Sequence, residues 1–166
     1  MTRKHWAVII VSAAGLGLVA LLWWTATDSD RQLERHVQLA LERYEHAFTK
    51  AGAQATLTPL PRDPYSPVLG VPAVRKATIH RDGWTVTAEF IGGSTTGPCG
   101  VDYTGRAVES EHAVLIVVEG HPHEYGRLCT AGGYSRQVTL RLNRPLGGRA
   151  VLEAVGGMPV PVTLER

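Results

Sequence analysis

Side chains able to bind a metal gather at one place in the sequence, His121-Pro122-His123-Glu124, with His112 shortly before it. A His-X-His pair in a β-strand directs both imidazoles to one side, as a zinc or copper ion requires. Pro122 favours a turn over a strand, however, and the spacing supplies no third ligand. We therefore expect an exposed loop and no metal, with His112, His121, His123 and Glu124 as the candidate ligands of the alternative interpretation.

Three further groups match catalytic motifs only in part. Glu109 and Glu111 share one strand face, like the paired carboxylates of glycosidases, but acidic residues at a strand end are usually just solvated. The stretch Gly132-Gly133-Tyr134-Ser135 lacks the spacing of a nucleophile elbow. The glycine-rich residues 92–98 lack the Lys-Ser/Thr of a phosphate-binding loop and precede no predicted helix. We expect no catalytic residue and no cofactor.

Three tyrosines lie in or near the segment between the two cysteines of the chain. They are Tyr103, Tyr125 and Tyr134. An aromatic binding surface and ordinary packing at a core or sheet edge both explain them. The sequence leaves these two interpretations open.

An apolar segment near the N-terminus predicts a membrane span. Residues 6–26 carry no charge, and Trp6 and Trp24 stand about 27 Å apart at a helical rise of 1.5 Å per residue. Arg3 and Lys4 precede the span, so the positive-inside rule places the N-terminus in the cytoplasm. A cleaved signal peptide is the rival interpretation, but cleavage after Ala26 would put Trp24 where a small residue belongs.

Charge outside this segment is balanced. The formal net charge of +2 comes from Arg3 and Lys4, because all 15 acidic residues and the other 15 of the 17 basic residues follow Thr27. A balanced domain offers no basic patch for nucleic acid, so we expect no nucleic-acid partner. The sequence thus predicts a cytoplasmic tail at 1–5, a signal-anchor at 6–27 and one folded unit at 28–166.

Helical periodicity follows the predicted span, over residues 28–52. Ser29 and Gln32 have the spacing of a capping box, and Gly52 is a natural stop. Apolar residues recur at helical intervals, and the opposite face is charged; the apolar stripe is Leu33, Val37, Ala40, Leu41, Tyr44 and Phe48, and the charged face is Arg31, Glu34, Arg35, Glu42, Arg43 and Glu45. The stripe packs on the domain's own sheet or joins two copies of the helix from Asp30 to Lys50 in a coiled coil, and we favour the first.

A proline-rich linker at 53–72 leads into a strand-rich region at 73–166. The hairpin signal Arg81-Asp82-Gly83 separates the first two predicted strands, and Pro159 and Pro161 restrict a last strand to a sheet edge. The predicted strands are 73–80, 84–90, 101–109, 113–119, 137–142 and 150–155. We expect an α+β fold with one antiparallel sheet of about six strands, or alternatively a β-sandwich with a flanking helix.

The only two cysteines, Cys99 and Cys129, both follow the predicted span, on the side that we expect to be oxidising. A disulfide between them would close a loop of roughly 30 residues and stabilise the fold by about 3 to 4 kcal/mol. The alternative, a redox-active pair, needs the close C-x-x-C spacing, which is missing.

The second half of the chain resembles a group of secreted or membrane-anchored proteins of high-GC actinobacteria that carry no assigned function. The resemblance rests on GPCGVDYTGRAVES at 97–110, on Cys129, and on RPLGGR at 144–149 followed by AVLE. It implies an extracytoplasmic setting and supports the pairing of Cys99 with Cys129. It implies no activity.

Together these features predict a single-pass protein of the plasma membrane with an extracellular, disulfide-bonded domain. We expect this domain to be a non-catalytic module that binds an envelope protein or ligand. The alternative is an extracytoplasmic metal-binding protein or hydrolase that uses His121 and His123.

Overall fold

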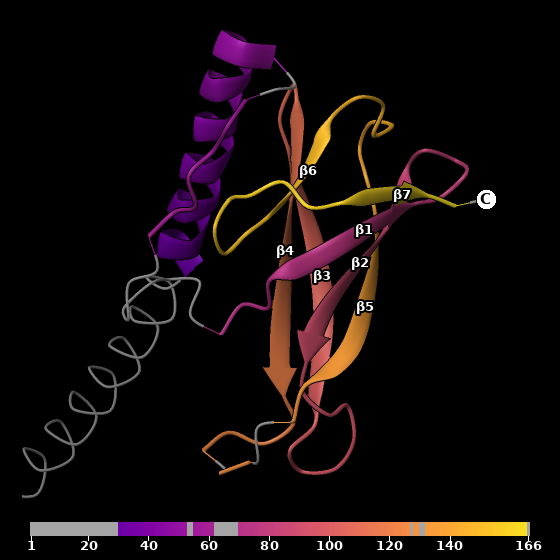
Figure 1. The fold of residues 1–166 in the computed structure, drawn as a ribbon. Coiled ribbons are helices and arrows are strands. Elements are labelled where there is room, and N and C mark those ends of the chain that lie inside the picture. The colour runs from indigo at the N-terminus through magenta and orange to yellow at the C-terminus, as the bar shows by residue number, and fades with distance from the viewer. Residues whose placement is uncertain (1–29, 53–54, 62–69, 127, 130–131, 166) are drawn as a thin grey trace, which may run out of the picture. The chain divides into compact units, whose positions relative to one another are not determined.

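The computed structural model describes residues 30–52, 55–61, 70–126, 128–129 and 132–165. The chain divides into two units, residues 1–35 and residues 36–166. Of the first unit only residues 30–35, the start of a helix, are described. The second unit contains the rest of that helix and all the strands, and it is α+β (Figure 1).

The predicted helix is confirmed over residues 30–51. Its stripe is buried within the second unit, since Val37, Ala40, Leu41 and Tyr44 are all less than 9% exposed. These side chains are therefore not available for the coiled coil that we considered. Gly52 ends the helix with φ of 60°, a conformation that glycine adopts without strain. The predicted cap at Ser29 lies outside the described residues.

In the described part of the chain seven strands follow, and they form two sheets. Their bounds are β1 Val74–Ile79, β2 Thr85–Gly92, β3 Val101–Glu109, β4 Ala113–Pro122, β5 Tyr134–Arg141, β6 Ala150–Glu153 and β7 Val162–Leu164. One sheet has the order β5-β2-β1-β7 and the other β3-β4-β6. The expectation of a single antiparallel sheet was wrong: both sheets are mixed, because β7 pairs parallel to β1 and β6 parallel to β4. As the prolines predicted, β7 lies at a sheet edge.

The hairpin of β1 and β2 forms where the turn signal predicted it. The Asp82 carboxylate accepts hydrogen bonds from the backbone N–H groups of Trp84 and Thr85 at 2.8 and 2.9 Å and from the Thr85 hydroxyl at 2.7 Å. Gly83 takes φ of 73°. The three bonds, led by that of the Thr85 hydroxyl, lower the pKa of Asp82 to about 2. Asp82 and Gly83, the residues that predicted the turn, therefore also stabilise it.

The two sheets pack face to face around one apolar core, as the sandwich alternative expected. The predicted alternation in β2 is confirmed, with Val86, Ala88 and Phe90 fully buried. The core between the sheets comprises Val74, Ala77, Ile79, Val86, Ala88, Phe90, Val114, Ile116, Val118, Val138, Leu140, Leu142, Leu146 and Val151. This core sets the relative position of the sheets.

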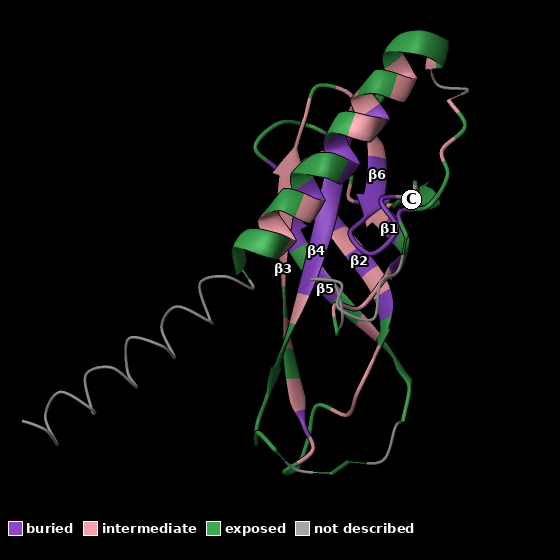
Figure 2. Cartoon of the chain, turned by 90° about the vertical axis from the view of Figure 1, so that its left-hand side faces the viewer, coloured by how far each residue is buried: buried purple, intermediate pink, exposed green. Residues whose placement is uncertain are grey.

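Residues 113–118 of β4 are buried on both faces, which explains their continuous apolar run. Val114, Ile116 and Val118 join the core between the sheets. Successive side chains of a strand point to opposite faces, so Leu115 and Val117, also fully buried, point the other way. In Figure 2 the part of the helix that belongs to the second unit, residues 36–51, lies across this outer face of β4, which is the surface that its apolar side chains cover.

Polar contacts anchor residues 36–51 of the helix on the sheet. Glu45 bonds to His112, just before β4, and Phe48 stacks on the His112 ring at 4.1 Å between ring centroids. Toward the other end, His36 Nε2 lies 3.0 Å from the carbonyl oxygen of Ala154, which follows β6. The helix therefore runs antiparallel to β4. The sequence placed Glu45 on the solvent face, and this was wrong because its carboxylate caps the start of β4.

Two predicted regions lie wholly or partly beyond this description. In the part of the chain that the structure describes, no helix combines the length and the hydropathy needed to span a bilayer. The predicted span at 6–26 lies outside the described residues. Of the proline-rich linker, residues 55–61 and 70–72 are described and form neither helix nor strand. Leu60 nevertheless is buried and donates its N–H to Gly156.

Candidate functional site

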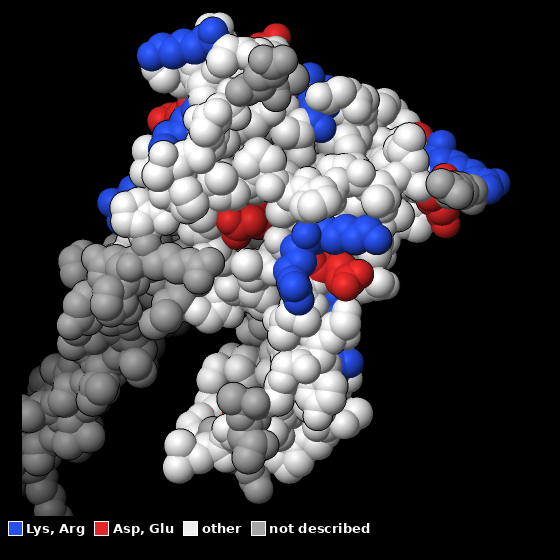
Figure 3. All heavy atoms as spheres, viewed as in Figure 1, with Lys and Arg blue, Asp and Glu red and all other residues white. Residues whose placement is uncertain are grey.

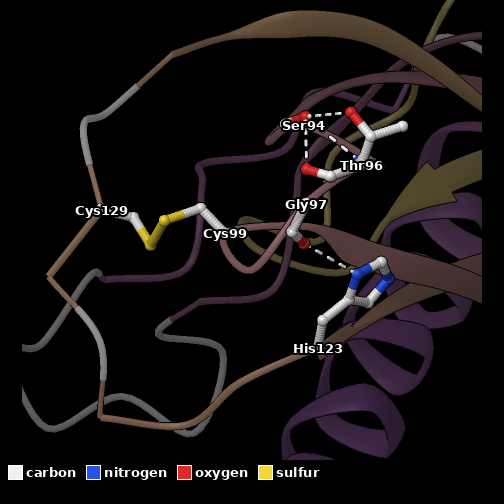
Figure 4. Close-up of a disulfide and its surroundings, with 6 residues drawn as sticks. All are labelled: Ser94, Thr96, Gly97, Cys99, His123 and Cys129. Atoms are coloured by element: carbon white, nitrogen blue, oxygen red, sulfur yellow. Dashed lines mark hydrogen bonds between the residues drawn. A yellow bond between two sulfur atoms is a disulfide. The ribbon is translucent and has the colours of Figure 1, made fainter.

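A disulfide joins the two loops at one end of the sandwich. Cys99, in the loop between β2 and β3, is bonded to Cys129, in the loop between β4 and β5, with Cα atoms 5.8 Å apart (Figure 4). The predicted pairing is confirmed. We call this end of the domain the disulfide tip, and define it as residues 91–101, 121–126, 128–129 and 132–135.

His123 fixes the first loop of the disulfide tip. Its Nδ1 lies 3.1 Å from the Gly97 carbonyl oxygen, its Nε2 lies 3.2 Å from the Asp102 carboxylate, and its backbone N–H donates to Gly100. Figure 4 shows the ring directed at Gly97. A Cβ on Gly100 would clash with the His123 ring, so glycine lets the ring take this position. The hydrogen bond to Asp102, then that to Gly97 and the Asp102 charge, raise the pKa of His123.

The candidate metal ligands do not come together. His121 bonds to the Thr104 hydroxyl through Nε2 at 3.0 Å. His112 lies at the other end of β4, about 30 Å from His121 at 3.3 Å per strand residue. Glu124 is exposed. Among the described residues no group of three His, Cys, Asp or Glu side chains is close enough to hold a metal ion.

The expected loop at His121-Pro122 is instead the end of a strand. Pro122 belongs to β4 and pairs with Val101 of β3. The N–H of His123 points toward the β3 side, where it donates a hydrogen bond to the carbonyl oxygen of Gly100, the residue before β3. Since backbone groups alternate in direction along a strand, the Pro122 nitrogen faces away from β3, where a missing N–H breaks no bond of the ladder.

The paired carboxylates have separate surroundings. Glu109 is 8% exposed in its side chain and forms an ion pair with Arg149, whose side chain is 9% exposed, at 2.7 Å. Burial alone would raise the pKa of Glu109, but the N–H of Asn143 and the Arg149 guanidinium outweigh it, so the pKa is lowered. Glu111 is exposed. Glu109 thus ties β3 to the loop before β6.

The three tyrosines divide between the two interpretations. Tyr103 packs against the core. Its ring meets that of Phe90 edge-on with centroids 4.9 Å apart, and its hydroxyl oxygen accepts a hydrogen bond from the Gly93 N–H at 2.6 Å. Tyr125 and Tyr134 are 85% and 52% exposed. The guanidinium of Arg136 lies over the Tyr134 ring at 5.0 Å from its centroid. Of the three tyrosines, Tyr125 and Tyr134 are the exposed ones.

A groove of about 520 Å³ opens at the disulfide tip. Its walls come from the ends of β2, β3 and β4 and from residues 70–72 and 132–133, and half of its lining residues are glycines. A hollow of about 340 Å³ adjoins it, with Gly93, Val101 and Gly132 in both linings, and reaches the disulfide and Tyr134. No residue lining either hollow carries a charged side chain. The disulfide therefore borders an uncharged concave surface.

The surface of the disulfide tip is also poor in charge. Residues 91–101 contain no Lys, Arg, Asp or Glu, nor do residues 128–135. Figure 3 shows the end of the molecule below β2 and β4 almost without charged side chains on this face. Apolar and aromatic side chains stand out from it: Leu128 is 101% exposed and Ile91 45%. Glu124 is the exception.

The glycine-rich loop 92–98 is part of this surface and has its own internal bonds. The Ser94 hydroxyl lies 3.2 Å from both the carbonyl oxygen and the N–H of Thr96, an ST-turn (Figure 4). A Cβ at Gly92 would meet the Tyr103 ring at 2.8 Å, so this glycine makes room for the tyrosine. The glycines are explained by packing and turns, without a phosphate.

A second hollow, of about 590 Å³, is lined by Ile79, Leu146 and other residues around β1 and β7. Four ionisable residues line it, His80, Arg81, Arg149 and Glu165, and all of them except Arg81 form an ion pair with a neighbour among the described residues. His80 Nδ1 lies 3.1 Å from the Glu165 carboxylate, and Arg149 bonds to Glu109. We therefore take the disulfide tip as the candidate binding surface.

The sequence pointed to the tyrosines and cysteines of this surface but not to the groove between the strand ends. A signal was present, since both loops combine glycines with an absence of charge. Comparison with known proteins adds no assignment: no family model, curated protein or solved structure matches this chain.

Proposed function

We propose that this chain is a non-catalytic interaction module of the cell envelope, held in the plasma membrane by the span predicted at residues 6–26. In this proposal the N-terminus is cytoplasmic and residues 28–166 lie outside the cell. The disulfide between Cys99 and Cys129 supports an oxidising setting, because such bonds persist outside the cytosol. The apolar segment and the two basic residues before it support the anchor.

The observation that carries the proposal is the disulfide tip. A covalently closed pair of loops displays Tyr125, Leu128 and Tyr134 beside an uncharged groove. Glu124 is the one Lys, Arg, Asp or Glu residue within the tip as defined above. Exposed aromatic and aliphatic side chains that gather around a concave surface are typical of binding sites.

The side chains first considered for catalysis have structural partners instead. Glu109 is bonded to Arg149, His112 to Glu45, and His123 to Asp102 and Gly97. Each of these contacts holds one element of the domain to another. The geometry thus favours binding over the alternative of a hydrolase.

Photo-crosslinking in living cells tests the proposal. A benzophenone amino acid is placed at Tyr125 or at Tyr134 of the full chain, and at Leu164 as a control, because Leu164 is 77% exposed but lies outside the disulfide tip. We expect discrete crosslinked products from the two tip positions and none from Leu164. Equal crosslinking at all three positions, or none at the tip, would contradict the assignment of this surface.

A further inference from the structure

We infer that the partner of the disulfide tip is the lipid surface of the membrane in which the chain itself is anchored. This inference rests on the proposed function, because it needs the span predicted at residues 6–26. In this arrangement Tyr125, Leu128 and Tyr134 enter the interfacial layer of the bilayer, and the domain lies against the membrane.

The chemistry of the disulfide tip suits the bilayer interface. Tyrosine is enriched at the level of the lipid headgroups, where its ring is apolar and its hydroxyl remains hydrated. Leu128 is fully exposed, and an aliphatic side chain is stabilised when it leaves water for an apolar environment. The uncharged loop 91–101 brings no charge that would have to be desolvated on contact.

The path of the chain within the second unit points to the same end. Residues 36–51 of the helix run antiparallel to β4, with Glu45 beside His112 and His36 beside Ala154. Because Glu153 pairs with Ile116, His36 lies level with the middle of β4. The chain therefore enters this unit at His36 running away from the disulfide tip, so the residues before His36 approach from the side on which the tip lies.

The length of chain between the predicted span and His36 is short. Nine residues separate Ala26 from His36, and even a fully extended chain of that length reaches at most about 35 Å. From the level of Val117 to Pro122, the last residue of β4 and part of the tip, the strand advances about 17 Å. The tether is thus short enough to keep the tip within reach of the bilayer.

The other exposed apolar group suits a membrane less well. Val162 and Leu164 of β7 are 40% and 77% exposed. They line the second hollow together with the charged side chains Arg81 and Glu165. Contact of this surface with lipid would desolvate those charges, which is costly. The disulfide tip brings fewer charges into such a contact, namely Glu124 among its own residues and Arg136 beside the Tyr134 ring.

Fluorescence quenching by lipids tests the inference on the full chain. A single cysteine replaces Tyr125, or Glu111 at the opposite end of β4 as the control, and is labelled with an environment-sensitive dye after the native disulfide has formed. Each protein is reconstituted into phosphatidylcholine vesicles, with and without phosphatidylglycerol, that contain a nitroxide-headgroup lipid. We expect strong quenching and protection from iodide at position 125, and neither at position 111, in both kinds of vesicle.

A second variant and the crosslinking result separate the possible failures. Leu128→Asp in the Tyr125 labelling background should reduce lipid quenching at least several-fold, since it introduces a charge into the contact. Equal quenching at 125 and 111 would overturn the inference. If the tip then still crosslinks to a protein, the proposed function stands without the lipid contact; failure of the chain to float with vesicles would overturn both.

Discussion

The carboxylate of Glu45 makes two contacts with His112. Its Oε2 lies 2.7 Å from the ring Nδ1, and its Oε1 accepts a hydrogen bond from the backbone N–H of His112 at 2.8 Å. These residues are 67 positions apart in the chain. The pair joins the helix to His112, which lies just before β4. Phe48 of the helix adds to this contact by stacking on the imidazole ring. Glu45 thus adds a specific polar contact to the apolar stripe and the His36 contact that hold the helix on the sheet.

Replacing Glu45 should weaken the domain in a pH-dependent way. Burial would raise its pKa, but the bonds from Ser110 and His112 and the His112 charge outweigh burial and lower it. The ionised carboxylate therefore adds stability above the unfolded pKa, near 4.5, and this stability is lost as the pH falls through the folded pKa. We expect Glu45→Gln to cost about 1–2 kcal/mol at pH 7 and less at about pH 3.

Thermal unfolding of the purified protein across this pH range measures the effect. Glu42→Gln is the matched control, because Glu42 lies on the same helix and is exposed. Equal losses for both variants would show that Glu45 does not fix the helix.

The disulfide tip should loosen as the pH rises. Both ring nitrogens of His123 face acceptors, Gly97 and Asp102, so only the protonated ring can donate to both. Its pKa is raised, so the stabilising contribution is complete below the unfolded pKa, near 6.5, and is lost as the pH rises through the folded pKa. We expect faster amide exchange at Gly100 above that pKa than the chemical rate predicts.

Hydrogen exchange with an NMR titration of His123 checks this expectation. His123→Asn should remove the pH dependence at Gly100, and His46→Asn, on the exposed side of the helix, should preserve it. A titration of His123 at or below its ordinary pKa would refute the explanation.

Arg149→Met should be among the most damaging single changes. It leaves the Glu109 carboxylate, 8% exposed, without its charged partner, and such losses cost about 3–5 kcal/mol. Urea unfolding of the purified protein measures the cost. The double variant Glu109→Gln with Arg149→Met should recover part of the stability, because it removes the unpaired charge; a double variant as unstable as the sum of both changes would argue against this.

Cys99→Ser should lower the melting temperature in oxidising buffer by the equivalent of about 3–4 kcal/mol, because the unfolded chain loses its crosslink. Reduction of the wild type should produce the same shift, measured by differential scanning calorimetry. If reductant left the melting temperature of the wild type unchanged, the disulfide would add no stability.

Val86→Asp should unfold the domain. Val86 is fully buried in the core between the sheets, and an unpaired charge there costs at least about 3 kcal/mol. Thr139→Asp, on the exposed face of β5 beside β2, is the control and should fold. Circular dichroism of both variants distinguishes them; native-like melting of the first would contradict the assigned strand face.

The amino-acid sequence by itself determined the elements that depend on local pattern. The alternation in β2, the apolar run of β4, the turn at Asp82-Gly83 and the stripe of the helix all report periodicity within a few residues. The two cysteines predicted their own bond because no other partner exists in the chain. These patterns can be read without knowing which elements pack together, because a helix or strand must bury one face whichever element covers that face.

The tertiary structure alone decided what each face meets. Periodicity marked Glu45 as solvent-facing, yet it bonds to a residue 67 positions away. The parallel pairings of β1 with β7 and of β4 with β6 join strands that are not consecutive, and no local pattern specifies a non-local partner. Pro122 lies in a strand because its nitrogen faces away from β3, a direction that only the sheet defines. The groove exists because three strand ends meet, and its shape follows from packing rather than from any one segment.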